Sequence, residues 1–148
     1  MWRNHQRKNL ELLLVEDNPA EVMLMEEMLA EAGVALDLKV VNDGEEALAY
    51  LRRGGRFAAA SRPDLIMLDL NLPGLDGRQV LREIKADPEL LAIPVIILST
   101  SQAEEDIRQC YQLQANCYIS KPVSLEEFIE VIRAIESFWF HTVKLPLR

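Results

Sequence analysis

The sequence predicts an α/β fold: a doubly wound, five-stranded parallel sheet covered on both faces by helices. Short apolar runs of strand length recur along the chain, and segments with apolar residues at helical spacing alternate with them. The chain has 148 residues, of which 49% are hydrophobic and 27% charged, which is typical of one globular domain with one sheet. The apolar runs are too short to cross a bilayer, so we expect them in the core and expect no membrane segment.

The first half of the chain predicts two strand–helix units. Residues 10–15 are nearly all apolar, and the turn formers after them start a helix whose apolar face ends at Gly33. Residues 36–41 alternate apolar with polar side chains, which is typical of an edge strand with one wetter face. Asp43 can cap the helix that follows, and residues 54–63 are rich in loop formers.

The second half predicts three further strands, each followed by a helix. The strands are residues 65–68, 93–98 and 117–119. The helix after the first of them contains Val80, Leu81 and Ile84, and the next one, residues 107–113, is poorly amphipathic. The last helix is the clearest, because apolar residues recur on one face at spacings of three and four. They are Leu125, Phe128, Ile132, Ile135 and Trp139.

Charge and cysteine usage exclude several classes of protein. The 24 acidic residues outnumber the 16 basic ones and give a net charge of -8, which disfavours nucleic acid as a partner. The first residues carry basic side chains without the apolar run of a signal peptide, so we expect a cytoplasmic protein. Cys110 and Cys117 have no metal or redox spacing, and we expect them to be structural.

Polar residues follow four of the predicted strands, at the point where each strand ends. In parallel sheets, ligands bind outside the carboxyl ends of the strands, so these residues should lie together in a site. They are Glu16 and Asp17, Asp69 and Asn71, Ser99 and Thr100, and Lys121, which is followed by Pro122.

This residue set favours phosphoryl chemistry with a hard metal ion. Three carboxylates placed together repel one another and need a cation, and an oxygen-only ligand set selects Mg²⁺. Asp69 is the candidate nucleophile, because a carboxylate can form an acyl phosphate when donors hold the incoming oxygens. Ser99 and Lys121 can supply those donors. Taken singly, a serine after a strand is more often a turn residue and a Lys-Pro pair more often an exposed loop.

Four motifs occur in the same order as the strands. They are Leu14-Val15-Glu16-Asp17-Asn18, residues 64–77 (DLIMLDLNLPGLDG), residues 94–99 (PVIILS) and Tyr118-Ile119-Ser120-Lys121-Pro122. Together they make the chain, from Leu10 to about Ser137, resemble the response regulator receiver domain. That resemblance implies a flavodoxin-like (βα)5 fold with strand order 2-1-3-4-5.

The resemblance also implies residue roles. Asp69 would be the phosphoacceptor, and Mg²⁺ would be held by Glu16, Asp17, Asp69 and the backbone carbonyl of Asn71. Ser99 and Lys121 would act on the phosphoryl group.

Further family features concern the surroundings of the site. Tyr118 falls on the family's aromatic switch position and would turn inward when Ser99 moves; the alternative is a tyrosine packed on the edge strand. The Lys121–Pro122 peptide bond would be cis, and a trans bond would weaken the match. We expect Thr100 to point away from the site.

The implied function is a stand-alone response regulator of a two-component phosphorelay, phosphorylated by a sensor histidine kinase. We expect no output domain and no enzyme activity beyond phosphorylation and dephosphorylation at Asp69. The longer loop at residues 54–63 and the apolar tail resemble regulators paired with bacterial phytochromes, so the implied kinase is a bacteriophytochrome. We expect a tail at residues 1–9, a receiver domain at 10–138 and a C-terminal extension at 139–148 that mediates homodimerisation; the alternative is that Trp139 and Phe140 cap their own domain.

Three other functions stay open. An aspartate-nucleophile phosphatase is disfavoured, because its general acid would fall at Asn71, which cannot transfer a proton. A flavin-binding module is disfavoured, because Glu16 and Asp17 would repel the flavin phosphate. An adaptor of this fold that works without phosphorylation would need none of the site residues, all of which are present.

Overall fold

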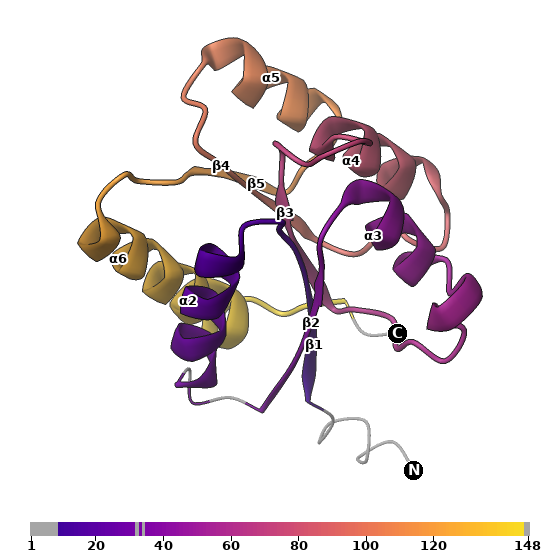
Figure 1. Cartoon of the computed structure of the whole chain (residues 1–148), viewed down its shortest axis with the longest axis horizontal. Helices are drawn as coiled ribbons and strands as arrows, with labels where there is room; N and C mark the ends of the chain where they lie inside the picture. Colours follow the sequence, from indigo (N-terminus) through magenta and orange to yellow (C-terminus); the bar gives the residue numbers. More distant parts are fainter. Residues whose placement is uncertain (1–8, 32, 34, 147–148) are drawn as a thin grey trace.

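The computed structural model describes residues 9–31, 33 and 35–146. Its centre is a five-stranded, fully parallel sheet with the strand order β2-β1-β3-β4-β5, which confirms the predicted topology (Figure 1). The strands are β1 (Leu10–Val15), β2 (Leu36–Val41), β3 (Leu65–Asp69), β4 (Val95–Ser99) and β5 (Cys117–Ser120). The predicted tail at residues 1–9 lies outside the described residues except for Asn9.

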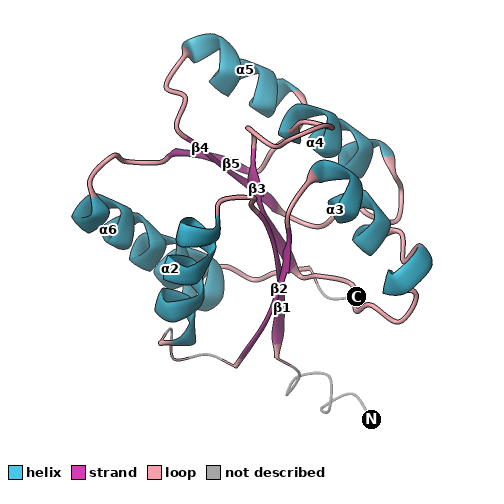
Figure 2. Cartoon of the chain, viewed as in Figure 1, coloured by secondary structure: helices cyan, strands magenta, loops and turns pink. Residues whose placement is uncertain are grey.

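Helices cover both faces of the sheet, as predicted. Helices α2 and α6 lie on one face, and α3, α4 and α5 lie on the other (Figure 2). The α-helices are α2 (Pro19–Ala30), α3 (Gly44–Leu51), α4 (Gly77–Ala86), α5 (Glu104–Gln112) and α6 (Leu125–Ile135). A short 3-10 helix, η1 (Gly55–Phe57), lies in the loop before β3, and a π-helix, η2 (Glu136–Thr142), continues α6. Within the described ranges, no helix is long and apolar enough to span a bilayer.

Side-chain caps start most of these helices. Asn18 accepts backbone N–H groups at the start of α2, and Asp43 caps α3 as predicted. Asp76 and Gln79 form a reciprocal capping box at α4, and Ser124 caps α6. Each cap satisfies backbone N–H groups that have no partner within the helix, so the loop that leaves each strand is tied to the helix after it.

Two apolar cores form because successive strand residues point to opposite faces of the sheet. Leu13 and Ile66 face the core under α3, α4 and α5, whereas Leu12, Leu14 and Met67 face the core under α2 and α6. Strands β3 and β4 are buried along their whole length. This double burial explains why the central strands appear in the sequence as unbroken apolar runs.

The structure differs from the sequence prediction at several element ends. Helix α5 begins at Glu104, and β4 begins at Val95, because Pro94 has no N–H to donate to the strand ladder. Helix α2 ends at Ala30, before Gly33, which adopts a left-handed φ of 77° in the loop. Leu125, predicted to be buried, has 60% of its surface exposed in the first turn of α6.

Candidate functional site at the carboxyl edge of the sheet

Three carboxylates meet where β1 and β3 end. Glu16 directly follows β1 and is 2% exposed, Asp17 beside it is exposed, and Asp69 ends β3 and is 6% exposed. One carboxylate oxygen from each lies within 4.8 Å of the others. The structure therefore brings together the three acidic side chains that the sequence places after different strands.

A glycine allows the backbone to close tightly behind Asp69. A Cβ atom on Gly77 would lie 2.5 Å from the Asp69 carbonyl oxygen and 2.6 Å from Leu70 Cα. Because glycine has no Cβ, helix α4 can begin directly against the end of β3, where the Gly77 N–H donates to the Leu70 carbonyl at 3.0 Å. Any larger residue at position 77 would clash with the backbone of Asp69 and Leu70, so the end of β3 or the start of α4 would have to move.

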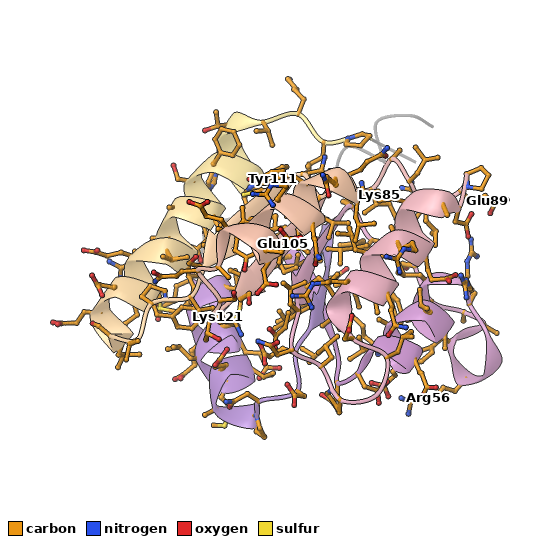
Figure 3. The ribbon with its side chains drawn as sticks, turned by 90° about the horizontal axis from the view of Figure 1, so that it is seen from above. Arg56, Lys85, Glu89, Glu105, Tyr111 and Lys121 are labelled. Atoms are coloured by element: carbon orange, nitrogen blue, oxygen red, sulfur yellow. The ribbon has the colours of Figure 1, made fainter. Side chains whose placement is uncertain are left out.

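Lys121 supplies the compensating positive charge. Its ammonium donates to Glu16 Oε1 at 2.8 Å and to Glu21 Oε1 at 2.7 Å, and it lies 3.7 Å from Asp69 Oδ1. The side chain lies beside helix α2 and is only 6% exposed (Figure 3). The Lys121 backbone N–H donates to the Ser99 carbonyl at 2.7 Å, which fixes the residue at the end of β5.

Glu21 is a site residue that the sequence reasoning missed. It lies in the first turn of α2, where it hydrogen-bonds Lys121. One signal was present in the sequence: Glu21 follows the capping residue Asn18 closely, and the start of α2 lies at the carboxyl edge of the sheet. An acidic residue in a first helical turn is common, however, because it interacts favourably with the helix dipole, so its type alone gave no indication.

Burial and the ion pairs act against each other on the pKa of each of these groups, and the pKa of all three is raised overall. Burial raises the pKa of Glu16 to about 7, although the hydrogen bond and charge of Lys121 act against the shift. Burial also raises the pKa of Asp69, partly offset by Lys121 and by the Asn71 N–H. Burial by itself would lower the pKa of Lys121, but its hydrogen bonds to Glu16 and Glu21 and the nearby carboxylates raise it overall. The cluster is thus short of positive charge when no other cation is bound.

The carboxylates line an open cavity of about 450 Å³. The lining residues are Glu16, Asp17, Asn18, Pro19, Glu21, Asp69, Asn71, Thr100 and Lys121. Thr100, which the sequence analysis expects to point away from the site, is exposed and contributes to this lining. The three acidic side chains offer oxygen donors only, so their chemistry fits a hard divalent cation.

Ser99 and Tyr118 meet at the loop between β4 and α5. Ser99 is fully buried at the end of β4, and its hydroxyl accepts the Ser101 backbone N–H at 3.1 Å. The Tyr118 hydroxyl donates to the Ser101 carbonyl at 2.9 Å, and its ring packs against the core under α3, α4 and α5. Both predicted switch residues therefore bond to the same loop residue.

The predicted cis bond before Pro122 is wrong. No cis peptide occurs in the described part of the chain, so Lys121–Pro122 is trans, the form that an X-Pro bond still prefers. Although a trans bond was expected to weaken the match, Lys121 reaches Glu16 and Asp69 with this geometry.

Comparison with known proteins agrees with this arrangement. The sequence pattern of the response regulator receiver domain matches residues 12–133. The response regulator Rcp1 of Synechocystis is 44% identical over 135 residues, covering 91% of this chain and 92% of Rcp1.

Solved structures give the same result. The phosphorylated cyanobacterial phytochrome response regulator RcpA is 51% identical with a TM-score of 0.92, over 95% of this chain and 100% of that one. The Mn²⁺-bound form of Rcp1 has a TM-score of 0.90 and 44% identity, over 93% of this chain and 99% of that one. With the fold, the order of the site residues and these relatives in agreement, the chain belongs to the response regulator receiver domain family of two-component signalling proteins.

Proposed function

We propose that this protein is a phosphorylation switch in which Asp69 accepts a phosphoryl group from a sensor histidine kinase. The observation that carries the proposal is the placement of Asp69: a nearly buried carboxylate at the end of β3, 3.7 Å from the Lys121 ammonium and next to two further carboxylates. Such a carboxylate is accessible through the cavity but held in one place. The relative RcpA was solved in a phosphorylated form, which supports the same chemistry in this chain.

In the proposed transfer, an Asp69 carboxylate oxygen attacks the phosphorus of a phosphohistidine on the kinase. The new P–O bond makes an acyl phosphate, and the P–N bond breaks with its electron pair going to the histidine ring nitrogen. Lys121 would neutralise charge on a phosphoryl oxygen, and the Ser99 hydroxyl would donate to another. The same site would return the group to water, so the only enzyme-like activity is at Asp69.

We propose Mg²⁺ as the metal of this site. Glu16, Asp17, Asp69 and the backbone carbonyl of Asn71 would hold it, and it would neutralise the charge that builds up on the transferred oxygens. The acidic cluster and the Mn²⁺-bound form of Rcp1 support a divalent metal. The choice of Mg²⁺ rests on its preference for a few carboxylates with retained water.

The proposed kinase partner is a bacteriophytochrome. The proposed setting is the cytoplasm, where ATP is available to phosphorylate the kinase. RcpA is a phytochrome response regulator, and the bacteriophytochrome response regulator RtBRR is 37% identical with a TM-score of 0.72. Phosphorylation would alter the surface near Tyr118 and α6, and the signal would pass through protein contacts. The net charge of -8 argues against nucleic acid as the target.

The test is the intact mass of the protein after incubation with acetyl phosphate and Mg²⁺. The unaltered protein should gain one phosphoryl group, whereas Asp69→Asn and a chelator-treated sample should gain none. A gain in Asp69→Asn would place the acceptor elsewhere. If no sample gains mass, and the unaltered protein also gains none when mixed with a phosphorylated bacteriophytochrome kinase, an adaptor that works without phosphorylation is favoured.

We further propose homodimerisation through the C-terminal extension at residues 139–148, next to a receiver domain at 10–138. Trp139 and Phe140 pack against the core under α2 and α6, whereas Phe138 beside them is 50% exposed. Phe138, at the junction with the extension, therefore offers an exposed apolar contact to a second copy beside that of the extension, and Trp139 stabilises its own domain.

Three variants separate these roles, with self-association measured by sedimentation and stability measured by urea unfolding. Phe138→Ala should weaken self-association with little change in the urea midpoint, and deletion of residues 140–148 should abolish it. Trp139→Ala serves as the comparison, because it should lower the urea midpoint. A monomer at every concentration of the unaltered protein would contradict the proposal.

A further inference from the structure

A hydrogen-bonded network outside the carboxylate cluster converges on Ser101, in the loop between β4 and α5. The Ser101 N–H donates to the Ser99 hydroxyl at 3.1 Å, and its carbonyl accepts from the Tyr118 hydroxyl at 2.9 Å and from the Ser120 hydroxyl at 3.4 Å. Its own hydroxyl donates to Asp106 Oδ2 at 2.5 Å and accepts the Ala103 N–H at 3.2 Å. All three polar groups of Ser101 are thus in use.

Two helices hold this residue in place. Asp106 lies in the first turn of α5, and its other oxygen, Oδ1, accepts from Arg78 Nη2 of α4 at 2.6 Å. Both side chains of this ion pair are only 28% exposed. Asp106 therefore ties the loop to α4 as well as to its own helix. The hydrogen bonds from Ser101 and Arg78 hold the pKa of Asp106 below its usual value, so it stays ionised and keeps both contacts at neutral pH.

Among the residues that the structure describes, none accepts the Ser99 hydroxyl hydrogen, so it can be donated to a ligand. A serine hydroxyl has one hydrogen and two lone pairs, and the Ser101 N–H occupies one of the lone pairs. The hydrogen bond that the Ser99 hydroxyl accepts from the Ser101 N–H fixes its oxygen, and in the proposed chemistry its own hydrogen would point to a phosphoryl oxygen. If Ser101 moves, this orientation is lost.

We propose that Asp106, held by Arg78, is a positioning residue for phosphoryl binding: it fixes Ser101, whose N–H orients the Ser99 hydroxyl and whose carbonyl holds Tyr118. The inference rests on the proposed phosphoryl chemistry at Asp69. It adds a support that runs from α4 through α5 to the site and lies apart from the carboxylates and Lys121. Through the same residue, α4 and α5 are coupled to the position of Tyr118.

The test measures the affinity of the Mg²⁺-loaded protein for beryllofluoride, a stable mimic of the phosphoryl group, by titration calorimetry. Asp106→Ala should weaken binding roughly three- to ten-fold, the range expected for one misplaced hydrogen bond. In a Ser99→Ala background, Asp106→Ala should cause no further loss, because the hydroxyl that it positions is gone. The amide resonance of Tyr118 should shift in Asp106→Ala without ligand.

Glu105→Ala is the matched control, because Glu105 is an exposed acid on the same helix whose ion pair with Arg108 does not touch the loop. It should leave the affinity unchanged. Asp106→Asn keeps the size of the side chain and should give a smaller loss, so it decides the matter if Asp106→Ala does not fold.

The outcomes separate this inference from the proposed function. If the unaltered protein does not bind beryllofluoride, the phosphoryl site itself is wrong. If it binds normally but Asp106→Ala and Asp106→Asn lose nothing, or lose as much in the Ser99→Ala background, Asp106 does not act through Ser99 and the inference is overturned. An equal loss in Glu105→Ala would overturn it as well, since the effect would then be one of surface charge.

Discussion

The two ends of the sheet each hold a lysine in a cage of oxygens, but the oxygens differ. At the carboxyl end, Lys121 donates to the carboxylates of Glu16 and Glu21. At the opposite end, Lys85 donates to neutral oxygens: the carbonyls of Leu91 at 3.1 Å and Ile93 at 3.2 Å, and the Asn116 side chain at 3.1 Å (Figure 3). One cage contains excess negative charge, and the other contains none.

This difference distinguishes a site that can bind a cation from a lysine that holds the fold together. Nearby carboxylates raise the pKa of Lys121 despite its burial, whereas burial lowers the pKa of Lys85. Asn116 also accepts the Val95 N–H at 2.8 Å, so the Lys85 cage holds the start of β4. Buried like charges destabilise a fold unless a cation joins them, so the carboxyl end has the electrostatics of a cation-binding site and the other end those of a clamp.

The largest expected effect is the loss of the Lys121 cation. Lys121→Met should lower the free energy of unfolding by about 3–5 kcal/mol at pH 8 without metal, because it leaves buried carboxylates without a partner. At pH 5 the loss should be smaller, because Glu16, whose pKa is about 7, is then protonated. Urea unfolding at both pH values measures this, with the exposed Lys39→Met as control. Equal losses at both pH values would mean that Lys121 acts through packing alone.

The next effect is a pH dependence set by Glu16. Because its pKa is raised from 4.5 to about 7 on folding, the folded state binds more protons than the unfolded state between those values. With respect to this group, stability without metal should therefore be highest below pH 4.5 and should fall by about 3 kcal/mol as the pH rises from 4.5 to 7. Glu16→Gln should flatten this part of the stability profile, and saturating Mg²⁺ should offset the fall. An unchanged slope in Glu16→Gln would assign it to another group.

At the opposite end, Lys85→Met should cost about 1–2 kcal/mol, because it removes hydrogen bonds to neutral oxygens. The lowered pKa of Lys85 means that the folded state loses its proton first, so the unaltered protein should gain stability as the pH rises toward 10.5. The variant should lack that gain. Urea unfolding between pH 7 and 10 tests both points, and phosphoryl uptake should stay unchanged. A loss of uptake would show that the two ends are coupled.

The smallest effect concerns Glu21. Glu21→Gln removes one of the carboxylates around Lys121, so an incoming phosphoryl group meets less repulsion, and phosphorylation by acetyl phosphate should become roughly three-fold faster. The matched control is Glu26→Gln, an exposed position on the same helix. Mass spectrometry over time gives both rates. A slower rate in Glu21→Gln would mean that Glu21 helps to place Lys121 rather than competing for it.

Most of the fold could be predicted because burial leaves a pattern in the sequence. Strand β1 was predicted with its observed ends, and the alternation of β2 correctly indicated an edge strand. The less accurate ends are the start of β4, where Pro94 cannot donate to the strand ladder, and the start of α5, where the first turn is acidic and no side chain caps the helix. Hydrophobicity marks neither boundary.

The sequence was enough to predict most of the residues that belong to the candidate site, because parallel strands place their last residues at the same edge of the sheet. Glu16, Asp17, Asp69 and Lys121 meet there as expected. Glu21 was missed, since its position depends on how α2 turns away from the sheet.

The α/β architecture and the acidic edge with its lysine follow from local properties of the chain, namely its periodicity and the residues that end each strand. Two features become visible only in the folded chain: Lys121 is shared between Glu16 and Glu21, and Ser101 links Ser99, Tyr118 and Asp106. Those contacts join residues from different strands and helices, and their distances follow from how the helices pack on the sheet, which no local pattern encodes.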